Sequence, residues 1–174
     1  VAFTGSTAVG QSIRKSTAGQ GKKLTLELGG KSAFIVFEDA DLDAAVEGLV
    51  DSIWFNQGEV CSANSRLLVE RSIQAEFVEK LVARATAMQP GNPLDPASKM
   101  GAMVSREQTD RVMHYIGIGK READLVTGGD QISIGGKGSF VQPTIFDNVR
   151  PDAQIAVDEI FGPVLAVIPF DTEA

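Results

Sequence analysis

Two expected strands and the turn between them stand in the stretch Leu24-Thr25-Leu26-Glu27-Leu28-Gly29-Gly30-Lys31-Ser32-Ala33-Phe34-Ile35-Val36-Phe37. In the first strand, Lys23 to Leu28, leucines alternate with polar residues, so the apolar side chains line one face. The glycine pair then forces a turn. The second strand, Ser32 to Phe37, is continuously apolar, which is typical of a parallel strand covered on both faces.

Helical and strand patterns alternate on both sides of this stretch. We expect four helices: one opening after Gly5 and running to about Ala18, one capped by Asp39 or Asp41, one capped by Ser72, and one over about Arg106 to Lys120. Further strands are expected at Val1 to Thr4 (short and buried), Arg66 to Glu70, Asp124 to Thr127, Phe140 to Ile145 and Val164 to Pro169. This alternation predicts an α/β fold with a mainly parallel sheet flanked by helices.

Composition excludes several classes of protein. The chain has 174 residues, of which 43% are hydrophobic, enough for one substantial core. A net charge of -7 without a basic stripe argues against nucleic acid and anionic membranes as partners, and no apolar run is long enough to cross a bilayer. The single cysteine cannot form an intramolecular disulfide, so we expect a cytoplasmic protein. One His and one Cys also make a zinc site improbable.

The two ends of the chain carry a further expectation. The sequence has no initiator Met, opens on an expected strand, and stops at Asp171-Thr172-Glu173-Ala174 directly after another. Because a domain rarely begins and ends in mid-sheet, we expect the chain to be an excerpt of a longer protein.

Cys61 lies within Asn56-Gln57-Gly58-Glu59-Val60-Cys61-Ser62. A lone cysteine is more often a small buried core residue than a nucleophile. The polar, turn-forming stretch before it instead favours a loop position. If a helical turn begins near Cys61, the backbone N–H groups there would favour a thiolate.

Glu27 has two interpretations. By periodicity it is a solvated carboxylate on the polar face of its strand. A carboxylate at a strand end beside Gly29-Gly30, where another group can approach the backbone closely, is also a candidate general base.

Two further segments are candidates for binding. Gly5-Ser6 joins a strand to a helix, where N–H groups can hold a phosphate, although Gly and Ser also occur there for capping alone. In Glu159-Ile160-Phe161-Gly162-Pro163, a turn before a strand explains the Gly-Pro pair but leaves Glu159 and Phe161 unassigned.

Taken together and in this order, these four segments resemble the aldehyde dehydrogenase superfamily. The 34-position separation of Glu27 and Cys61 also fits the base and nucleophile of that family. The resemblance covers essentially the whole chain. It implies residues 1–30 as the last strand-helix-strand piece of a Rossmann-like NAD(P)-binding domain, and residues 31–174 as a catalytic domain truncated at its C-terminus.

The resemblance also implies the chemistry. Cys61 attacks a small aldehyde to give a thiohemiacetal and then a thioester, and Glu27 activates the water that hydrolyses it. For the cofactor, NAD or NADP, Gly5 and Ser6 approach the diphosphate, Glu159 holds the nicotinamide ribose, and Phe161 packs near the ring. The cofactor-binding set is completed by Leu28 and Gly29, and by Gln108 and Arg111 at the adenosine ribose, the latter usually Lys in relatives.

Details of Cys61-Ser62-Ala63-Asn64-Ser65-Arg66-Leu67 and Gln89 to Pro96 are similar to the γ-glutamyl-γ-aminobutyraldehyde and ω-aminoaldehyde dehydrogenases of polyamine breakdown. Betaine-aldehyde and general aldehyde dehydrogenases share much of this pattern. The resemblance further implies a homo-oligomeric parent protein, with an oxyanion-hole Asn, adenosine contacts, pocket-closing stretch and oligomer arm outside this chain.

Two alternatives stay open beside aldehyde oxidation. The chain could be a catalytically incomplete fragment that serves only as a folded domain, or a weak esterase acting through Cys61. Retention of both Cys61 and Glu27 favours the oxidation, because a purely structural role needs neither.

Overall fold

The computed structural model describes residues 1–173, which form two compact units. The first unit, residues 1–30, is a βαβ element: β1 (Ala2–Thr4), α1 (Thr7–Thr17) and β2 (Thr25–Glu27). Its two strands pair in parallel, with Phe3 opposite Leu26. Gly10 is buried against Leu28, because a Cβ at this glycine would overlap the leucine side chain. The short strands are more exposed than expected, since two strands and one helix leave a sheet face uncovered.

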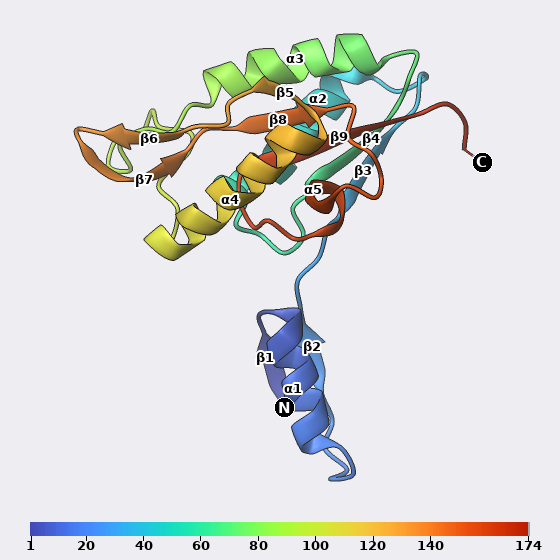
Figure 1. The fold of residues 1–174 in the computed structure, drawn as a ribbon, viewed down its shortest axis with the longest axis vertical. Coiled ribbons are helices and arrows are strands. Elements are labelled where there is room, and N and C mark those ends of the chain that lie inside the picture. Colours follow the sequence, from blue (N-terminus) through green and yellow to red (C-terminus); the bar gives the residue numbers. More distant parts are fainter. Residues whose placement is uncertain (174) are drawn as a thin grey trace. The chain divides into compact units, whose positions relative to one another are not determined.

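The second unit, which begins at Lys31, is built on a five-stranded sheet in the order β3-β4-β9-β8-β5 (Figure 1). The strands are β3 (Ala33–Val36), β4 (Arg66–Glu70), β9 (Val164–Phe170), β8 (Thr144–Asp147) and β5 (Asp124–Thr127). The first four pair in parallel, and only β5 at one edge runs antiparallel to its neighbour. A mainly parallel sheet flanked by helices confirms the expected fold class.

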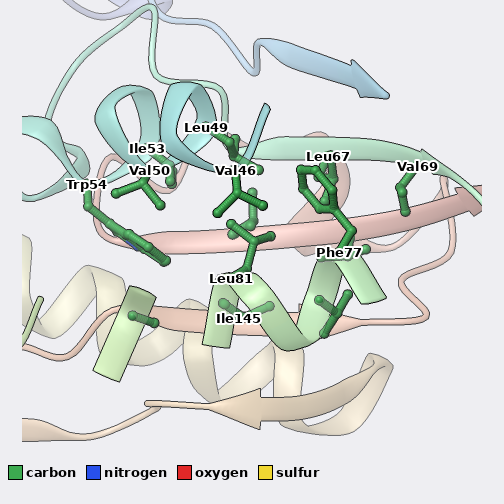
Figure 2. Close-up of a cluster of buried hydrophobic side chains, with 14 of the residues drawn as sticks. Val46, Leu49, Val50, Ile53, Trp54, Leu67, Val69, Phe77, Leu81 and Ile145 are labelled. Atoms are coloured by element: carbon green, nitrogen blue, oxygen red, sulfur yellow. The ribbon is translucent and has the colours of Figure 1, made fainter. Parts of the chain in front are cut away.

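Helices cover the two faces of this sheet. One face packs against α2 (Leu42–Ile53) and α3 (Gln74–Ala87), and the other against α4 (Arg106–Glu122) and α5 (Gln154–Val157). Central strand β9 shows the alternation directly: Leu165 and Val167 belong to the first core, while Val164, Ala166 and Ile168 belong to the second. Figure 2 shows the first core, where residues of α2 such as Leu49 and Ile53 meet Phe77 and Leu81 of α3.

The sequence pattern located most of these elements. Asp41 caps α2 by accepting a hydrogen bond from the Ala44 N–H at 3.1 Å, as one of the two expected caps. Ser72 does not cap α3, because residues 71–73 form a turn and the helix begins only at Gln74; its hydroxyl instead donates to Glu38 at 3.4 Å.

Two strand predictions for the second unit were wrong in detail, and one strand was not predicted. Ile35 is 56% exposed, because β3 is an edge strand and α2 covers only one of its faces. The strand expected at Phe140 to Ile145 is two strands, β7 (Lys137–Val141) and β8, with Pro143 between them. Strand β6 (Gln131–Ile134), which pairs with β7 in a hairpin that extends from the sheet (Figure 1), was not expected at all. Its short length and the flanking glycines gave it a loop-like sequence.

Candidate active site

Cys61 lies in a turn between η1 (Phe55–Gly58) and strand β4, and its side chain is exposed. The exposed position argues against the core-cysteine alternative, and the loop location is as the sequence indicated. No helix begins at this cysteine, because η1 ends before it and an irregular turn follows. The conditional expectation of a helix N-terminus beside the thiol is therefore not met.

The backbone just before Cys61 adopts an unusual conformation. Asn56, Gln57 and Gly58 have consecutive φ values of 47°, 57° and 74°, all in the left-handed region. For residues with a Cβ this region costs roughly 1–2 kcal/mol each. Such a run persists only where surrounding contacts hold it. The Asn56 side-chain amide supplies one of them, because it donates to the Glu59 carbonyl at 3.2 Å.

Two side chains of this loop reach residues 101–104, far along the chain. The Gln57 amide donates to the Ala102 carbonyl at 3.2 Å and accepts from the Gly101 N–H at 3.1 Å. Both carboxylate oxygens of Glu59 accept from the Val104 N–H at 3.2 Å. Burial raises the pKa of Glu59, and the hydrogen bond from Val104 opposes that rise.

The Cys61 loop also packs directly on the segment that holds Glu159 and Phe161. A Cβ at Gly58 would overlap the carbonyl oxygen of Gly162, and a Cβ at Gly162 would overlap the Val112 side chain of α4. Only glycine allows the backbones to approach this closely. The structure therefore brings together the loop that precedes Cys61, the Glu159 segment and α4, which are distant in sequence.

Helix α4 holds the Glu159 segment by its backbone. The Gln108 amide donates to the carbonyls of Ile160 and Phe161 at 3.1 and 2.7 Å, and Arg111 donates to the Glu159 carbonyl at 2.8 Å. Phe161 itself has a φ of 61°. These contacts fix the main chain, and among the described residues the Glu159 carboxylate accepts no hydrogen bond.

Tyr115 of α4 also anchors the Glu159 segment. The Tyr115 hydroxyl donates to Asp158 at 3.0 Å, and the Arg111 guanidinium lies 5.2 Å from the centre of the Tyr115 ring. Burial, reinforced by Asp158, raises the pKa of Tyr115. Residues 158–161 are thus anchored to successive turns of one helix.

Lys31, at the end of the glycine-pair motif, is a buried cation near this segment. Burial and the like charge of Arg66 lower the pKa of Lys31 to about 8, whereas Asp158 and Glu159 act in the opposite direction. Within the part of the chain that the structure describes, Lys31 Nζ and Arg66 Nε are buried without a hydrogen-bond partner. Lys31 was not among the predicted site residues, although its place directly after the Gly29-Gly30 pair was a usable signal.

The remaining candidates lie in the first unit. Ser6 caps α1 by accepting from the Val9 N–H at 3.4 Å, and the Gly5 N–H donates to the Glu27 carbonyl at 3.0 Å. Glu27 ends β2 with its side chain exposed, and Leu28 packs on Gly10. The strand-helix junction and the end of β2 are therefore neighbours within this unit, with Gly29 directly beyond.

Membrane-spanning helices and metal-binding groups are the remaining features of a possible site. None of the helices in residues 1–173 is long and apolar enough to span a membrane. Over the same residues, no group of three or more His, Cys, Asp or Glu side chains is arranged to hold a metal ion.

Comparison with known proteins gives one family. The family model described as "Aldehyde dehydrogenase family" matches residues 1–174. Betaine aldehyde dehydrogenase of Rhizobium etli is 47% identical over 99% of this chain and 36% of its own length.

Solved structures agree with that match. The γ-glutamyl-γ-aminobutyraldehyde dehydrogenase of Burkholderia cenocepacia has a TM-score of 0.93 at 53% identity, over 98% of this chain and 35% of that one. The indole-3-acetaldehyde dehydrogenase of P. syringae, solved in complex with NAD+, has a TM-score of 0.95 at 47% identity, over 99% and 35%. The chain spans about a third of the length of the relatives that it matches.

Proposed function

Since this chain belongs to the aldehyde dehydrogenase family, we propose that its protein oxidises an aldehyde to a carboxylic acid with NAD or NADP, through Cys61 as nucleophile and Glu27 as general base. One observation carries the proposal. The exposed thiol stands on a loop held in a left-handed conformation and packed directly against the Glu159 segment. A nucleophile needs such access together with a fixed position.

The first unit fits a dinucleotide. Helix α1 is 11 residues long, its first turn contains no acidic side chain, and Gly5, Ser6 and Thr7 are all exposed. The first-turn N–H groups can therefore receive diphosphate oxygens. In the second unit the Glu159 carboxylate, which accepts no hydrogen bond from the residues that the structure describes, suits the hydroxyls of the nicotinamide ribose, and Phe161 suits its ring. We propose Leu28, Gly29, Gln108 and Arg111 as further cofactor contacts.

Cys61 and Glu27 carry out the proposed reaction in two stages. The Cys61 thiolate attacks the aldehyde carbonyl carbon, and the backbone N–H of Cys61 stabilises the resulting oxyanion of the thiohemiacetal. When bound, the nicotinamide ring supplies the hydride acceptor that the oxidation requires. Loss of that hydride leaves a thioester on Cys61. Glu27 takes a proton from water, whose oxygen attacks the thioester carbon, and the acid is released as the thiolate re-forms.

The sequence detail and the names of two relatives support a proposal for the substrate class. Two of them are named for cationic or amino-derived aldehydes, betaine aldehyde and γ-glutamyl-γ-aminobutyraldehyde. We propose an ω-aminoaldehyde of polyamine catabolism as the substrate. We also propose a cytoplasmic homo-oligomer.

We expect the isolated chain to differ in activity from the full-length protein. Because it spans about a third of its relatives, we propose that the isolated 174 residues show little or no dehydrogenase turnover. Robust NAD+ reduction by the chain, abolished by Cys61→Ala, would overturn this proposal. Weak esterase activity is the second candidate, because the exposed thiol lies wholly within the second unit.

Mass spectrometry tests the mechanism. The full-length protein carrying Glu27→Gln, mixed with NAD+ and excess ω-aminoaldehyde, should accumulate an acyl adduct on Cys61, because hydrolysis is blocked after oxidation. The matched control, Glu27→Gln with Cys61→Ala, should show no adduct. An unmodified Cys61 under these conditions contradicts the proposed mechanism.

A further inference from the structure

The side chains of Gln57 and Glu59 form a clamp, by which we mean their three hydrogen-bonded links to residues 101–104. Gln57 uses both ends of its amide, one on the Ala102 carbonyl and one on the Gly101 N–H. Glu59 directs both oxygens to the Val104 N–H. A segment more than forty residues away in sequence is thus tied to Gln57, within the left-handed run, and to Glu59, directly after that run.

The clamp is placed in a poorly hydrated environment. Glu59 is 9% exposed, and Gln57 is half-buried. Burying a carboxylate against a single backbone N–H is unfavourable compared with leaving it in water. The raised pKa of Glu59 has the same cause. An apolar side chain would avoid this cost but would leave the Val104 N–H without its acceptor, so the polar side chain at position 59 maintains the link to residues 101–104.

The segment that the clamp grips leads directly into α4. Val104 precedes Ser105, whose hydroxyl caps α4 by accepting from the Gln108 N–H at 3.1 Å. The side chain of Gln108 in turn holds the carbonyls of Ile160 and Phe161. Continuous hydrogen bonds therefore run from the Cys61 loop, through residues 101–105, to the segment of Glu159 and Phe161.

We propose that Gln57 and Glu59 are positioning residues, which set Cys61 relative to the Glu159–Phe161 segment by holding both to the start of α4. The inference rests on the proposed function. The clamp opposes the relaxation of three consecutive left-handed residues, which would otherwise move the thiol. Misplacement of a reacting group by about 1 Å can lower a rate about 100-fold.

Four variants of the full-length protein test this proposal. Gln57→Ala and Glu59→Ala remove the two arms of the clamp. Glu59→Gln keeps an oxygen that accepts from the Val104 N–H while it removes the charge. Gln74→Ala is the matched control, because Gln74 also bridges distant residues, donating to Asp147 and Asn148 at 2.8 and 3.0 Å, but at the start of α3.

The readout is the rate of the NADH burst that accompanies acylation of Cys61, together with hydrogen exchange of the Val104 amide. We expect both alanine variants of the clamp to slow the burst about 10- to 100-fold. Their Val104 amide should exchange faster, while Glu59→Gln stays within about threefold of wild type in both measurements. Gln74→Ala should lower the melting temperature without slowing the burst.

The burst and adduct measurements distinguish failure of the positioning role from failure of the proposed aldehyde oxidation. If the unmodified protein gives neither burst nor acyl adduct, the proposed function fails. If it gives both, and Glu59→Ala is folded and acylates at the normal rate, the positioning role is wrong while the function stands. A burst slowed equally by Gln74→Ala would show a general effect of lost stability and would also overturn the positioning role. Should an alanine variant not fold, Glu59→Gln at the wild-type rate supports the proposal, and a tenfold slower rate contradicts it.

Discussion

Gly58 and Gly162 touch through their backbones: a Cβ on Gly58 would overlap the carbonyl oxygen of Gly162 and crowd the nitrogen of Pro163. This contact joins the Cys61 loop to the segment of Glu159 and Phe161 without any side chain between them. Gly58 also has a φ of 74°, so this position combines a close approach with a conformation that favours glycine.

Replacement of Gly58 by alanine should therefore lower the free energy of unfolding by more than the left-handed backbone conformation alone would. We expect Gly58→Ala to destabilise the second unit by roughly 2–4 kcal/mol, since the left-handed conformation and the displaced Gly162 both contribute. The matched control is Gly135→Ala, with a φ of 60° and nothing within 4 Å of the added Cβ. It should lose only about 1 kcal/mol. Equal losses of unfolding free energy in denaturant titrations would show that the contact with Gly162 is unimportant.

Local patterning accounts for most of the fold. The helix expected after Asp39 or Asp41 is α2, where Leu42, Val46, Leu49 and Ile53 recur every three to four residues, as is typical of a buried helix face. Strand β4 was located over Arg66–Glu70, where β-branched and leucine residues stand between polar ends. The hairpin of β6 and β7 was not predicted, because Gly135, Gly136 and Gly138 interrupt the alternating pattern of a strand. These three glycines adopt positive φ values.

The site was less accessible to sequence reasoning. The motifs identified Cys61 and Glu159 as candidates, but they did not reveal that Gln57 and Glu59 are bonded to residues 101–104. That pairing depends on how two loops meet in three dimensions, and no local periodicity encodes it. The same holds for the hydrogen bonds from Gln108 to the carbonyls of residues 160 and 161.

Loss of the Gln108 side chain should loosen the proposed cofactor contacts. Gln108→Ala removes two hydrogen bonds, each worth about 1 kcal/mol, from the backbone that carries Glu159 and Phe161. We expect the KM for NAD+ in the full-length protein to rise about 5- to 30-fold. Steady-state kinetics at fixed aldehyde concentration measure this change.

Arg111→Lys serves as the comparison, because a lysine can still donate to the Glu159 carbonyl. Its KM for NAD+ should change less than about threefold. A KM for NAD+ that is unaltered in Gln108→Ala would contradict the idea that this backbone shapes the cofactor site.

The first core offers a test of a buried polar atom. Trp54 is 1% exposed, and among the described residues its indole N–H has no hydrogen-bond partner. Trp54→Phe should leave the unfolding free energy within about 1 kcal/mol, since relief of the unpaired N–H offsets the lost packing. Phe77→Leu, which shortens a fully buried ring without such relief, should cost about 1–2 kcal/mol. Calorimetry of both variants decides the question, and a larger loss in Trp54→Phe than in Phe77→Leu would refute this account.

Lys31 makes the stability of the second unit depend on pH. Burial, with Arg66 adding to it, lowers the pKa of Lys31 to about 8 in the folded chain, from 10.5. Below pH 8 the ammonium is charged in both states, so folding carries the full penalty of burying it, roughly 3 kcal/mol. Between pH 8 and 10.5 the unfolded chain binds a proton that the folded chain has lost. Stability due to this group therefore rises with pH through that interval, and the penalty disappears above it.

Lys31→Met removes the titrating group while it keeps an apolar stem of similar length. At pH 7 the variant should be more stable than the parent chain by up to about 3 kcal/mol, and the difference should shrink towards zero by about pH 10.5. Tyr115, whose pKa is raised, titrates in both chains and cancels in the difference. Urea titrations at several pH values provide the measurement. A difference that stays constant from pH 7 to 10.5 would mean that Lys31 keeps its ordinary pKa, and a variant less stable at pH 7 would mean that Asp158 and Glu159 stabilise the charged form more than burial opposes it.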